Sequence, residues 1–204
     1  MIRLDKDGDV WTVTIDRPEK AGALTKDMLA QLADIATDAQ AAKVLILTGT
    51  GKVYSAGADL DAARAGLATD QVWERLSSAI ADLPALTVAS LNGTVAGGAM
   101  GMVLACDLRI AVPEAKFFYP VMKLGFLPQP SDPPRLAALI GPARAKKILM
   151  AGQKIGAEQA LAWGLLDGIV AAGDLMPKAL ELGQDVLNAQ LSHIGAIKRM
   201  IPAR

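Results

Sequence analysis

The feature that most constrains the fold is a continuous apolar run, KVLILTG, at residues 43–49. Such a run is typical of a strand that is covered on both faces, as in a parallel sheet between two layers of helices. The preceding segment, LTKDMLAQLADIATDAQ at 24–40, has the 3.6-residue apolar spacing of a helix, and Thr25 is placed to cap its start. Together the two segments predict an α/β chain.

The same alternation continues along the chain. We expect strands at 10–16 and 108–112, a buried strand and turn at 87–96, a Gly-rich loop at 50–60, and helices at 70–83 and 101–107. This order predicts parallel βαβ units with right-handed crossovers. Beyond it the apolar spacing is helical, so we expect an α/β core at 1–132 and a helical C-terminal region at 133–204, with no linker between independent domains.

The composition excludes several function classes. Lysine plus arginine equals aspartate plus glutamate at 21 each, so no overall charge attracts the chain to nucleic acid or to a membrane surface. No apolar leader or membrane span is visible in the sequence, and we expect a cytoplasmic protein. Cys106 is the single cysteine and His193 the single histidine, which excludes an internal disulfide and a zinc site built on thiolates or paired histidines. We expect Cys106 in the core and no metal site.

Two glycine-rich segments share one design. Each places a buried strand before a loop of glycine and alanine that leads towards a helix: KVLILTGTGKVYSAGADLD at 43–61 and LTVASLNGTVAGGAMGM at 86–102. Such loops let a ligand contact backbone N–H groups, and two N–H groups that converge on one point form an oxyanion hole. The alternative is that both loops are only tight strand-to-helix connections whose glycines serve packing. Neither segment has the pattern of a P-loop or of a dinucleotide-binding loop.

Four segments together resemble the enoyl-CoA hydratase/isomerase (crotonase) superfamily. IDRPEKAGALTKDML, LILTGTGKVYSAGADL, LNGTVAGGAMGMVLACDLRIA and the stretch from KLGFLP to LLDGIV stand in the family's order. The resemblance implies an α/β fold of the ClpP/crotonase type, with a repeated ββα core and C-terminal helices used in forming a homotrimer or hexamer. It also implies a lyase or isomerase whose small-molecule ligand is an acyl-CoA, so that coenzyme A enters with the substrate and not as a permanent cofactor. Relatives continue for one or two more helices, so we expect a C-terminal region that is truncated relative to the family.

By the same resemblance, the N–H groups of Ala58 and Gly98 hold the thioester carbonyl. The resemblance also implies that the adenine and pantetheine parts of coenzyme A lie along the backbone at Ala21, Ala23, Ala56, Asp59 and Leu60. Lys20 either adds positive charge near the CoA phosphates or is a solvated surface residue. An enolate next to a thioester places its charge on the carbonyl oxygen, so one hole serves several reactions, and the acids and bases decide between them.

The sequence departs from the family at both hydratase glutamates, whose positions hold Gly101 and Val121 here. A two-carboxylate addition of water therefore lacks its acid and its base. The nearest carboxylate is Asp132 in PQPSDPPRL, which is either a proton carrier or a turn or N-cap residue ahead of a helix. Tyr119 is either a hydrogen-bond donor into the pocket or a packing residue.

Two functions remain after these departures. The first is an enzyme that acts on acyl-CoA thioesters, with Ala58 and Gly98 as catalytic groups that hold the enolate and with Asp132, a bound water or the substrate itself as the proton carrier. The second is a catalytically inactive or weak homologue that still binds acyl-CoA. A structural oligomer without a ligand would leave both glycine loops unexplained. We expect Asp107 to be structural.

Overall fold

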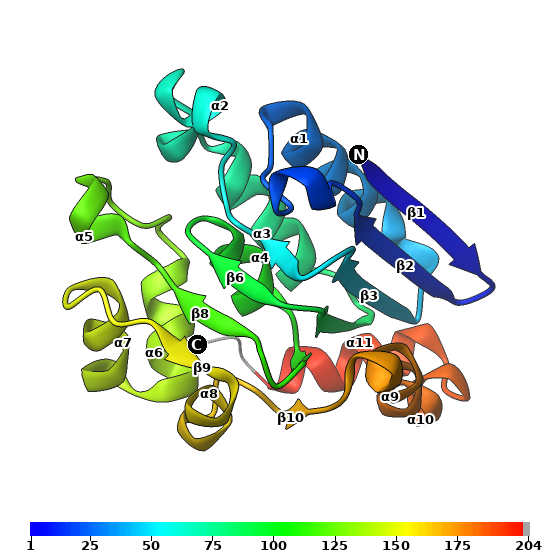
Figure 1. Ribbon diagram of the computed structural model, residues 1–204. Coiled ribbons are helices and arrows are strands. Elements are labelled where there is room, and N and C mark those ends of the chain that lie inside the picture. Colours follow the sequence, from blue (N-terminus) through cyan, green and yellow to red (C-terminus); the bar gives the residue numbers. More distant parts are fainter. Residues whose placement is uncertain (202–204) are drawn as a thin grey trace.

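The computed structural model of the chain describes residues 1–201, which form two sheets and their covering helices (Figure 1). The larger sheet has six strands. In spatial order they are β1 (Ile2–Asp7), β2 (Val10–Ile15), β3 (Val44–Gly49), β5 (Leu86–Leu91), β7 (Leu108–Ala111) and β10 (Gly168–Ile169). The smaller sheet has four: β4 (Val53–Ser55), β6 (Thr94–Ala96), β8 (Lys116–Phe118) and β9 (Ile155–Gly156). Only the β1–β2 and β8–β9 pairs are antiparallel among these strands.

The chain repeats a unit of two strands followed by helix. In three successive units the first strand joins the larger sheet and the second joins the smaller one: β3 with β4, β5 with β6, and β7 with β8. The helices of these and the first unit are α1 (Lys26–Asp38), α2 (Leu60–Arg64), α3 (Val72–Ala81), α4 (Ala99–Ala105), α5 (Val121–Leu124) and α6 (Asp132–Ile140). The later helices are α7 (Pro142–Leu149), α8 (Ala157–Trp163), α9 (Leu175–Leu182), α10 (Gln184–Leu187) and α11 (Leu191–Met200).

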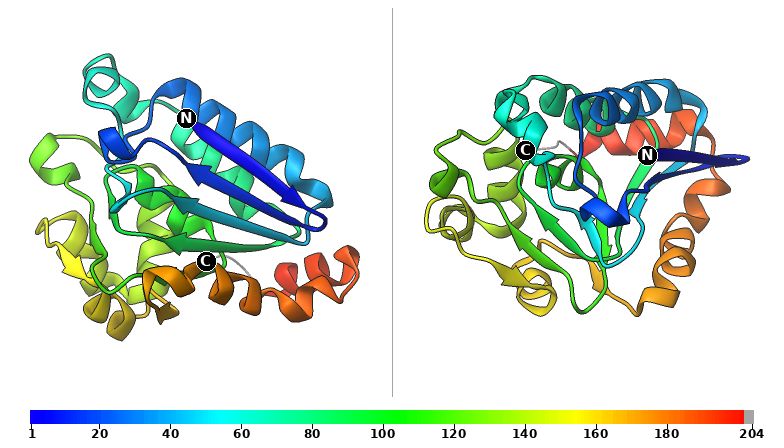
Figure 2. Two further views of the ribbon diagram at one scale, coloured as in Figure 1. Left: turned by 45° about the vertical axis from the view of Figure 1, so that its right-hand side comes forward. Right: turned by 45° about the horizontal axis from the view of Figure 1, so that its top comes forward.

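The strand expected at 43–49 is confirmed as β3, and it lies at the centre of the larger sheet. Residues 44–47 are all buried, because β2 and β5 pair with β3 on either side while helices cover both faces. Figure 2 shows α1 and α9 on opposite sides of this sheet. The cap expected at Thr25 is also confirmed, since its hydroxyl accepts the Met28 N–H at 3.3 Å.

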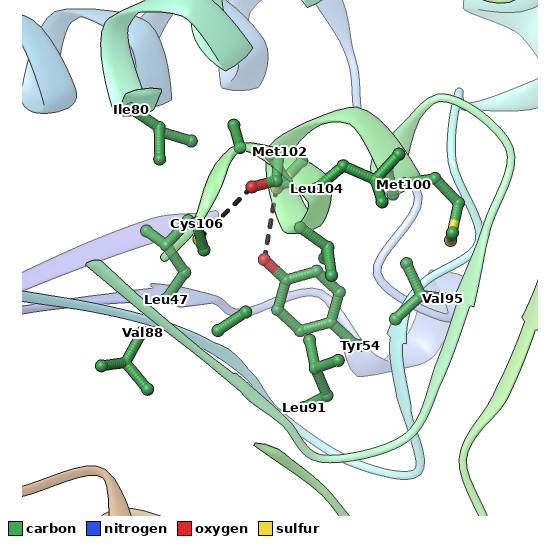
Figure 3. Close-up of a cluster of buried hydrophobic side chains, with 14 of the residues drawn as sticks. Leu47, Tyr54, Ile80, Val88, Leu91, Val95, Met100, Met102, Leu104 and Cys106 are labelled. Carbon is green, nitrogen blue, oxygen red and sulfur yellow. Dashed lines mark hydrogen bonds between the residues drawn. The ribbon is translucent and has the colours of Figure 1, made fainter. Parts of the chain in front are cut away.

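Helix α4 runs through the middle of the core and is buried along its whole length. A helix with no polar face is stable only when it is enclosed on every side. Helices α3 and α6 pack against it, and Figure 3 shows its side chains against strand residues. The Tyr54 hydroxyl reaches Met102 Sδ at 3.2 Å, and Cys106 Sγ lies 3.3 Å from the Met102 carbonyl. Cys106 is thus a core residue, as expected, and burial raises the pKa of its thiol to about 12.

The structure adds strands where the residue pattern did not indicate them. β1 forms a hairpin with β2, although five of its six residues are exposed. The segment at 50–60, expected to be only a loop, contains β4. Two short strands of the C-terminal region, β9 and β10, each complete one sheet. The division between 132 and 133 and the oligomerisation role of the second part stay predictions.

Across the described residues, every helix is too short or too polar to cross a bilayer.

Candidate active site

The two glycine-rich loops expected from the sequence lie against each other in the structure. Gly57 has a φ of 90° and Gly97 has a φ of 59°, a backbone region that glycine adopts without strain. A Cβ placed on Gly57 would lie 2.8 Å from the Ala96 carbonyl oxygen and 3.5 Å from the Gly98 nitrogen. The loops therefore touch through bare backbone, which explains the small residues better than local turn geometry does.

Ala58 and Gly98 each follow one of these positive-φ glycines. The neighbours of Ala58 are tied to Leu24, because the Gly57 carbonyl accepts the Leu24 N–H and the Asp59 N–H donates to the Leu24 carbonyl, both at 2.8 Å. Within residues 1–201, neither the Ala58 N–H nor the Gly98 N–H donates a hydrogen bond to protein. Two free donors therefore stand on adjacent loops.

The indole of Trp73 lies against one of these loops. A Cβ on Gly98 would be 3.1 Å from three carbons of the ring, so no side chain fits there. The ring is itself buried and held by a hydrogen bond from Nε1 to the Leu67 carbonyl at 2.8 Å. The Gly98 side of the loops is thus walled by an aromatic surface, which lowers the local dielectric and strengthens hydrogen bonds made there.

Asp132 reaches the same region from α6. Its side chain is buried, with the residue only 1% exposed, and Oδ2 accepts the Tyr119 hydroxyl at 2.9 Å. The other oxygen, Oδ1, has no hydrogen-bond partner among residues 1–201. It faces Gly101, where a Cβ would lie only 2.7 Å from it. The carboxyl group therefore occupies space that any side chain at 101 would need, three residues after Gly98 on α4.

The environment of Asp132 favours its neutral form. The pKa of the carboxyl is raised to about 7, mainly because the group is buried and to a lesser extent because of the nearby charge of Glu74. The Tyr119 hydrogen bond and the Arg135 charge oppose this increase. Burial and Asp132 in turn raise the pKa of Tyr119, so the phenol stays a donor. A carboxyl group with a pKa near neutrality both accepts and donates protons at physiological pH.

The capping interpretation of Asp132 is wrong. The N-cap of α6 is Ser131, and no side chain of its own segment caps the helix; Asp132 is the first helical residue. The packing interpretation of Tyr119 is incomplete, because its hydroxyl is bonded to Asp132. Val121 is buried at the start of α5 and offers no proton.

The positions expected to contact coenzyme A lie on two paired segments. The Ala56 N–H donates to the Ala21 carbonyl at 2.9 Å, and Arg17 both bonds the Ala23 carbonyl and pairs with Asp59, each at 2.9 Å. Ala21 is the non-glycine residue with positive φ in the described chain, at 52°. Leu60 is 75% exposed, and Lys20 is exposed beside Ala21. The structure thus brings all six positions to one edge of the molecule, and their role stays a prediction.

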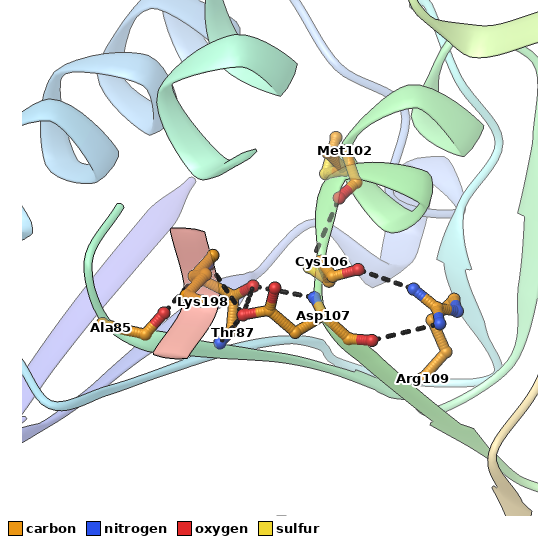
Figure 4. Close-up of polar contacts among 7 residues, drawn as sticks. All are labelled: Ala85, Thr87, Met102, Cys106, Asp107, Arg109 and Lys198. Carbon is orange, nitrogen blue, oxygen red and sulfur yellow. Dashed lines mark hydrogen bonds and ion pairs between the residues drawn. The ribbon is translucent and has the colours of Figure 1, made fainter. Parts of the chain in front are cut away.

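Asp107 is structural, as expected, and Figure 4 shows its contacts. Its Oδ2 accepts the Thr87 N–H and hydroxyl and pairs with Lys198 of α11 at 2.8 Å. Arg109, which is buried, donates to the Cys106 and Asp107 carbonyls next to it. His193 is exposed on α11 and is separate from the loops at 57 and 98. Among residues 1–201, no three acidic, histidine or cysteine side chains gather as metal ligands.

Glu74, which lies next to Trp73 on α3, is not among the site residues expected from the sequence. Its carboxylate accepts the Ser131 N–H at 3.2 Å and also bonds the Ser131 hydroxyl. Glu74 lines a groove of about 700 Å³ between α1, α3 and the segment 129–130. The sequence gives no signal for this contact, because a glutamate between apolar positions of an amphipathic helix is usually a solvated residue.

Comparisons with known proteins identify the family of the chain. The model of the enoyl-CoA hydratase/isomerase family matches residues 5–204. The chain belongs to this family. Among its curated relatives, YngF of Bacillus subtilis (strain 168) is 39% identical over 180 residues, covering 83% of this chain and 69% of that protein. Carnitinyl-CoA dehydratase of Escherichia coli (strain K12) is 33% identical over 207 residues, covering 98% of this chain and 79% of that protein.

Solved structures of the family confirm the crotonase-like fold expected from the resemblance. A Thermobifida fusca YX protein solved in complex with CoA superposes with a TM-score of 0.86 at 27% identity, over 98% of this chain and 83% of that one. The predicted family and fold class are therefore both correct.

Proposed function

We propose that this enoyl-CoA hydratase/isomerase family member is an enzyme that transfers a proton at the carbon next to the carbonyl of an acyl-CoA thioester. The Ala58 and Gly98 N–H groups hold the thioester oxygen, and Asp132 carries the proton. The observation that carries this proposal is the position of Asp132 Oδ1, which is buried, free of partners in the described chain and directly over Gly101. A buried carboxyl oxygen without a partner costs stability, and a cost of this kind is typical of functional sites.

The chemistry follows from where the charge moves. When Asp132 takes the proton from the carbon beside the thioester carbonyl, the electron pair passes to the carbonyl oxygen. Two backbone donors stabilise that oxyanion, and each such donor contributes about 3 kcal/mol in known enzymes. The protonated Asp132 then returns the proton to the same carbon or to another carbon of the conjugated enolate. One carboxyl group is enough for this sequence.

Coenzyme A is proposed to bind as part of the substrate at the edge formed by residues 20–23 and 56–60. The paired backbones of these segments and the Arg17–Asp59 ion pair hold that edge in a fixed shape. The CoA complex of the Thermobifida fusca relative supports this part of the proposal, because its fold matches over 98% of this chain. No metal or permanent cofactor has a part in the proposed step.

A second function, binding of acyl-CoA without turnover, is favoured by Val121. An apolar residue stands where hydratases of the family carry a glutamate, so the site has one carboxyl group where they have two. Both functions require the loops at 57 and 98, and only the first requires Asp132.

The experiment that separates them measures Asp132→Asn. The wild type is incubated with crotonyl-CoA, a 3-enoyl-CoA and butyryl-CoA in heavy water, and deuterium uptake and turnover are followed by mass spectrometry. We expect the substitution to lower the rate by about 10²- to 10⁴-fold, as loss of a general acid–base does, with CoA affinity unchanged. Asp61→Asn is the matched control, because the Asp61 side chain is 91% exposed. Binding without uptake or turnover in the wild type would establish the second function.

Self-association, a homotrimer or hexamer in the family pattern, is also a proposal. It is supported by exposed apolar side chains in the segment around α5: Met122, Leu124, Phe126 and Leu127, the last being 85% exposed. Sedimentation of the wild type and of Leu127→Lys tests it, and a monomer in both would contradict it.

A further inference from the structure

Two side chains from different elements act on Asp132 and its surroundings, Tyr119 by direct contact and Glu74 through the residue before Asp132. Tyr119 follows β8 and donates its hydroxyl to Asp132 Oδ2 at 2.9 Å. Glu74 comes from α3 and bonds both the N–H and the hydroxyl of Ser131, the residue directly before Asp132. The contact of Glu74 with Ser131 replaces a helix cap, because no side chain of the segment before α6 caps its first turn.

The Glu74 carboxylate is itself fixed in place. The Ser78 hydroxyl, one helical turn further along α3, donates to Glu74 Oε1 at 3.3 Å. Glu74 is half-buried and lines the groove beside residues 129–130, so it keeps a partial contact with water, while Asp132 is enclosed. The negative charge of a nearby carboxylate disfavours ionisation of a buried carboxyl group.

We propose that Glu74 and Tyr119 are positioning residues that bias the protonation of Asp132 in opposite directions, Glu74 by keeping a second carboxylate beside it and Tyr119 by donating a hydrogen bond to it. The inference deepens the proposed function, on which it rests. The charged and titratable groups around Asp132 are these two and Arg135 of the same helix, whose positive charge acts in the same direction as Tyr119. A single carboxyl group that must both take and return a proton needs such opposed influences to stay near neutrality.

The test is a titration of the Asp132 carboxyl carbon by ¹³C NMR in the whole chain. We expect Glu74→Gln to lower the titration midpoint of Asp132 and Tyr119→Phe to raise it, each by roughly one pH unit or more. One pH unit is a tenfold change in the ratio of protonated to ionised Asp132 at a given pH. The double variant should lie between them. Glu181→Gln and Tyr54→Phe are the matched controls, since Glu181 is exposed and pairs with Lys178 of the same helix, α9, and the Tyr54 hydroxyl contacts Met102.

The variant Ser131→Ala distinguishes the effect of the Glu74 charge from the support that Glu74 gives to the start of α6. It removes one bond to Glu74 but keeps the carboxylate in place through the Ser131 N–H. If Glu74 only supports the start of α6, Ser131→Ala and Glu74→Gln will act alike; if its charge matters, only Glu74→Gln will lower the midpoint. Hydrogen exchange of the α6 amides in each variant tests whether α6 is intact.

Unmoved midpoints, or midpoints that move in the same direction in Glu74→Gln and Tyr119→Phe, would overturn the inference. The titration needs no turnover, so its result is independent of the proposed function. If the midpoints shift as expected while no thioester exchanges a proton, the inference stands and the proposed function fails. If Asp132→Asn abolishes turnover while the midpoints stay fixed, the reverse holds.

Discussion

Adding one methyl group at Gly101 should displace the carboxyl group of Asp132. The Cβ of Gly101→Ala would lie 2.7 Å from Oδ1, 3.2 Å from Oδ2 and 3.3 Å from Cγ, whereas ordinary contact begins at 3.4 Å. Oδ1 must therefore retreat by about 0.7 Å, the difference between 3.4 and 2.7 Å. Tyr119 and the packing of α4 against α6 resist this movement.

The effect on stability should be small and the effect on rate large. Overpacking a core costs about 1–3 kcal/mol, and replacing a helical glycine by alanine returns about 1 kcal/mol, which leaves a net loss of about 0–2 kcal/mol. Displacing a catalytic group by about 1 Å lowers rates by about 100-fold, so we expect a loss of roughly 10- to 100-fold here.

Urea unfolding and deuterium uptake by acyl-CoA measure the two quantities. Gly173→Ala is the control, because a Cβ there meets nothing within 4 Å. If Gly101→Ala keeps the wild-type rate and unfolds like Gly173→Ala, then Asp132 does not fill the space over Gly101 and the proposed site is wrong.

Three further predictions concern stability and the loops. Because the pKa of Asp132 is raised from the ordinary 3.8 to about 7, the folded state loses stability as the pH rises from about 4 to about 7. At about 1.4 kcal/mol per pH unit, the wild type should lose about 4 kcal/mol relative to Asp132→Asn across that range, measured by urea unfolding. Parallel pH profiles of the two proteins would contradict this. Gly57→Ala should lose more stability and more thioester affinity than Gly66→Ala. Both glycines have positive φ, at 90° and 98°, which costs an alanine about 1–2 kcal/mol, but of the two new Cβ atoms only that at 57 meets a neighbour, the Ala96 oxygen at 2.8 Å. Equal losses would show that the loops do not touch. Lys198→Met should cost about 1–3 kcal/mol and speed hydrogen exchange in α11, because Asp107 then loses its positively charged partner. Unchanged exchange would show that the ion pair between Lys198 and Asp107 does not hold α11 in place.

Much of the fold is predictable because its signals are local. The apolar run at 43–49 identifies a strand buried on both faces, and Thr25 identifies the start of α1 from one residue. β1 gives no such signal, since five of its six residues are exposed and its only partner is β2. The two-residue strands β9 and β10 form only because long-range packing brings them to a sheet edge, which no window of sequence can show.

The candidate site also has features that the sequence predicts and features that it does not. The glycine loops are visible in the sequence because positive φ and close backbone approach demand a specific residue type. The relation of Asp132 to Gly101 is not visible, because it depends on how α6 packs against α4. The segment PSDPP has the local pattern of a turn or cap. The turn forms, with the Asp132 N–H bonded to the Gln129 carbonyl, but the Asp132 side chain bonds Tyr119 and does not cap the helix. Glu74 is missed for the same reason, since its partner Ser131 lies 57 residues away.

The missing side chain at position 101 has a consequence for how variation in related chains is read. An oxygen of residue 132 lies only 2.7 Å from where a β-carbon at 101 would be. The space between α4 and α6 therefore has room for one carboxyl group, carried either by position 101 or by position 132. Homologous sequences should then show an either-or relation, with an acidic residue at one of the two positions and a glycine or other small residue at the other. Sorting homologues as active or inactive from position 101 alone would misplace every chain in which the acid has moved to the neighbouring helix.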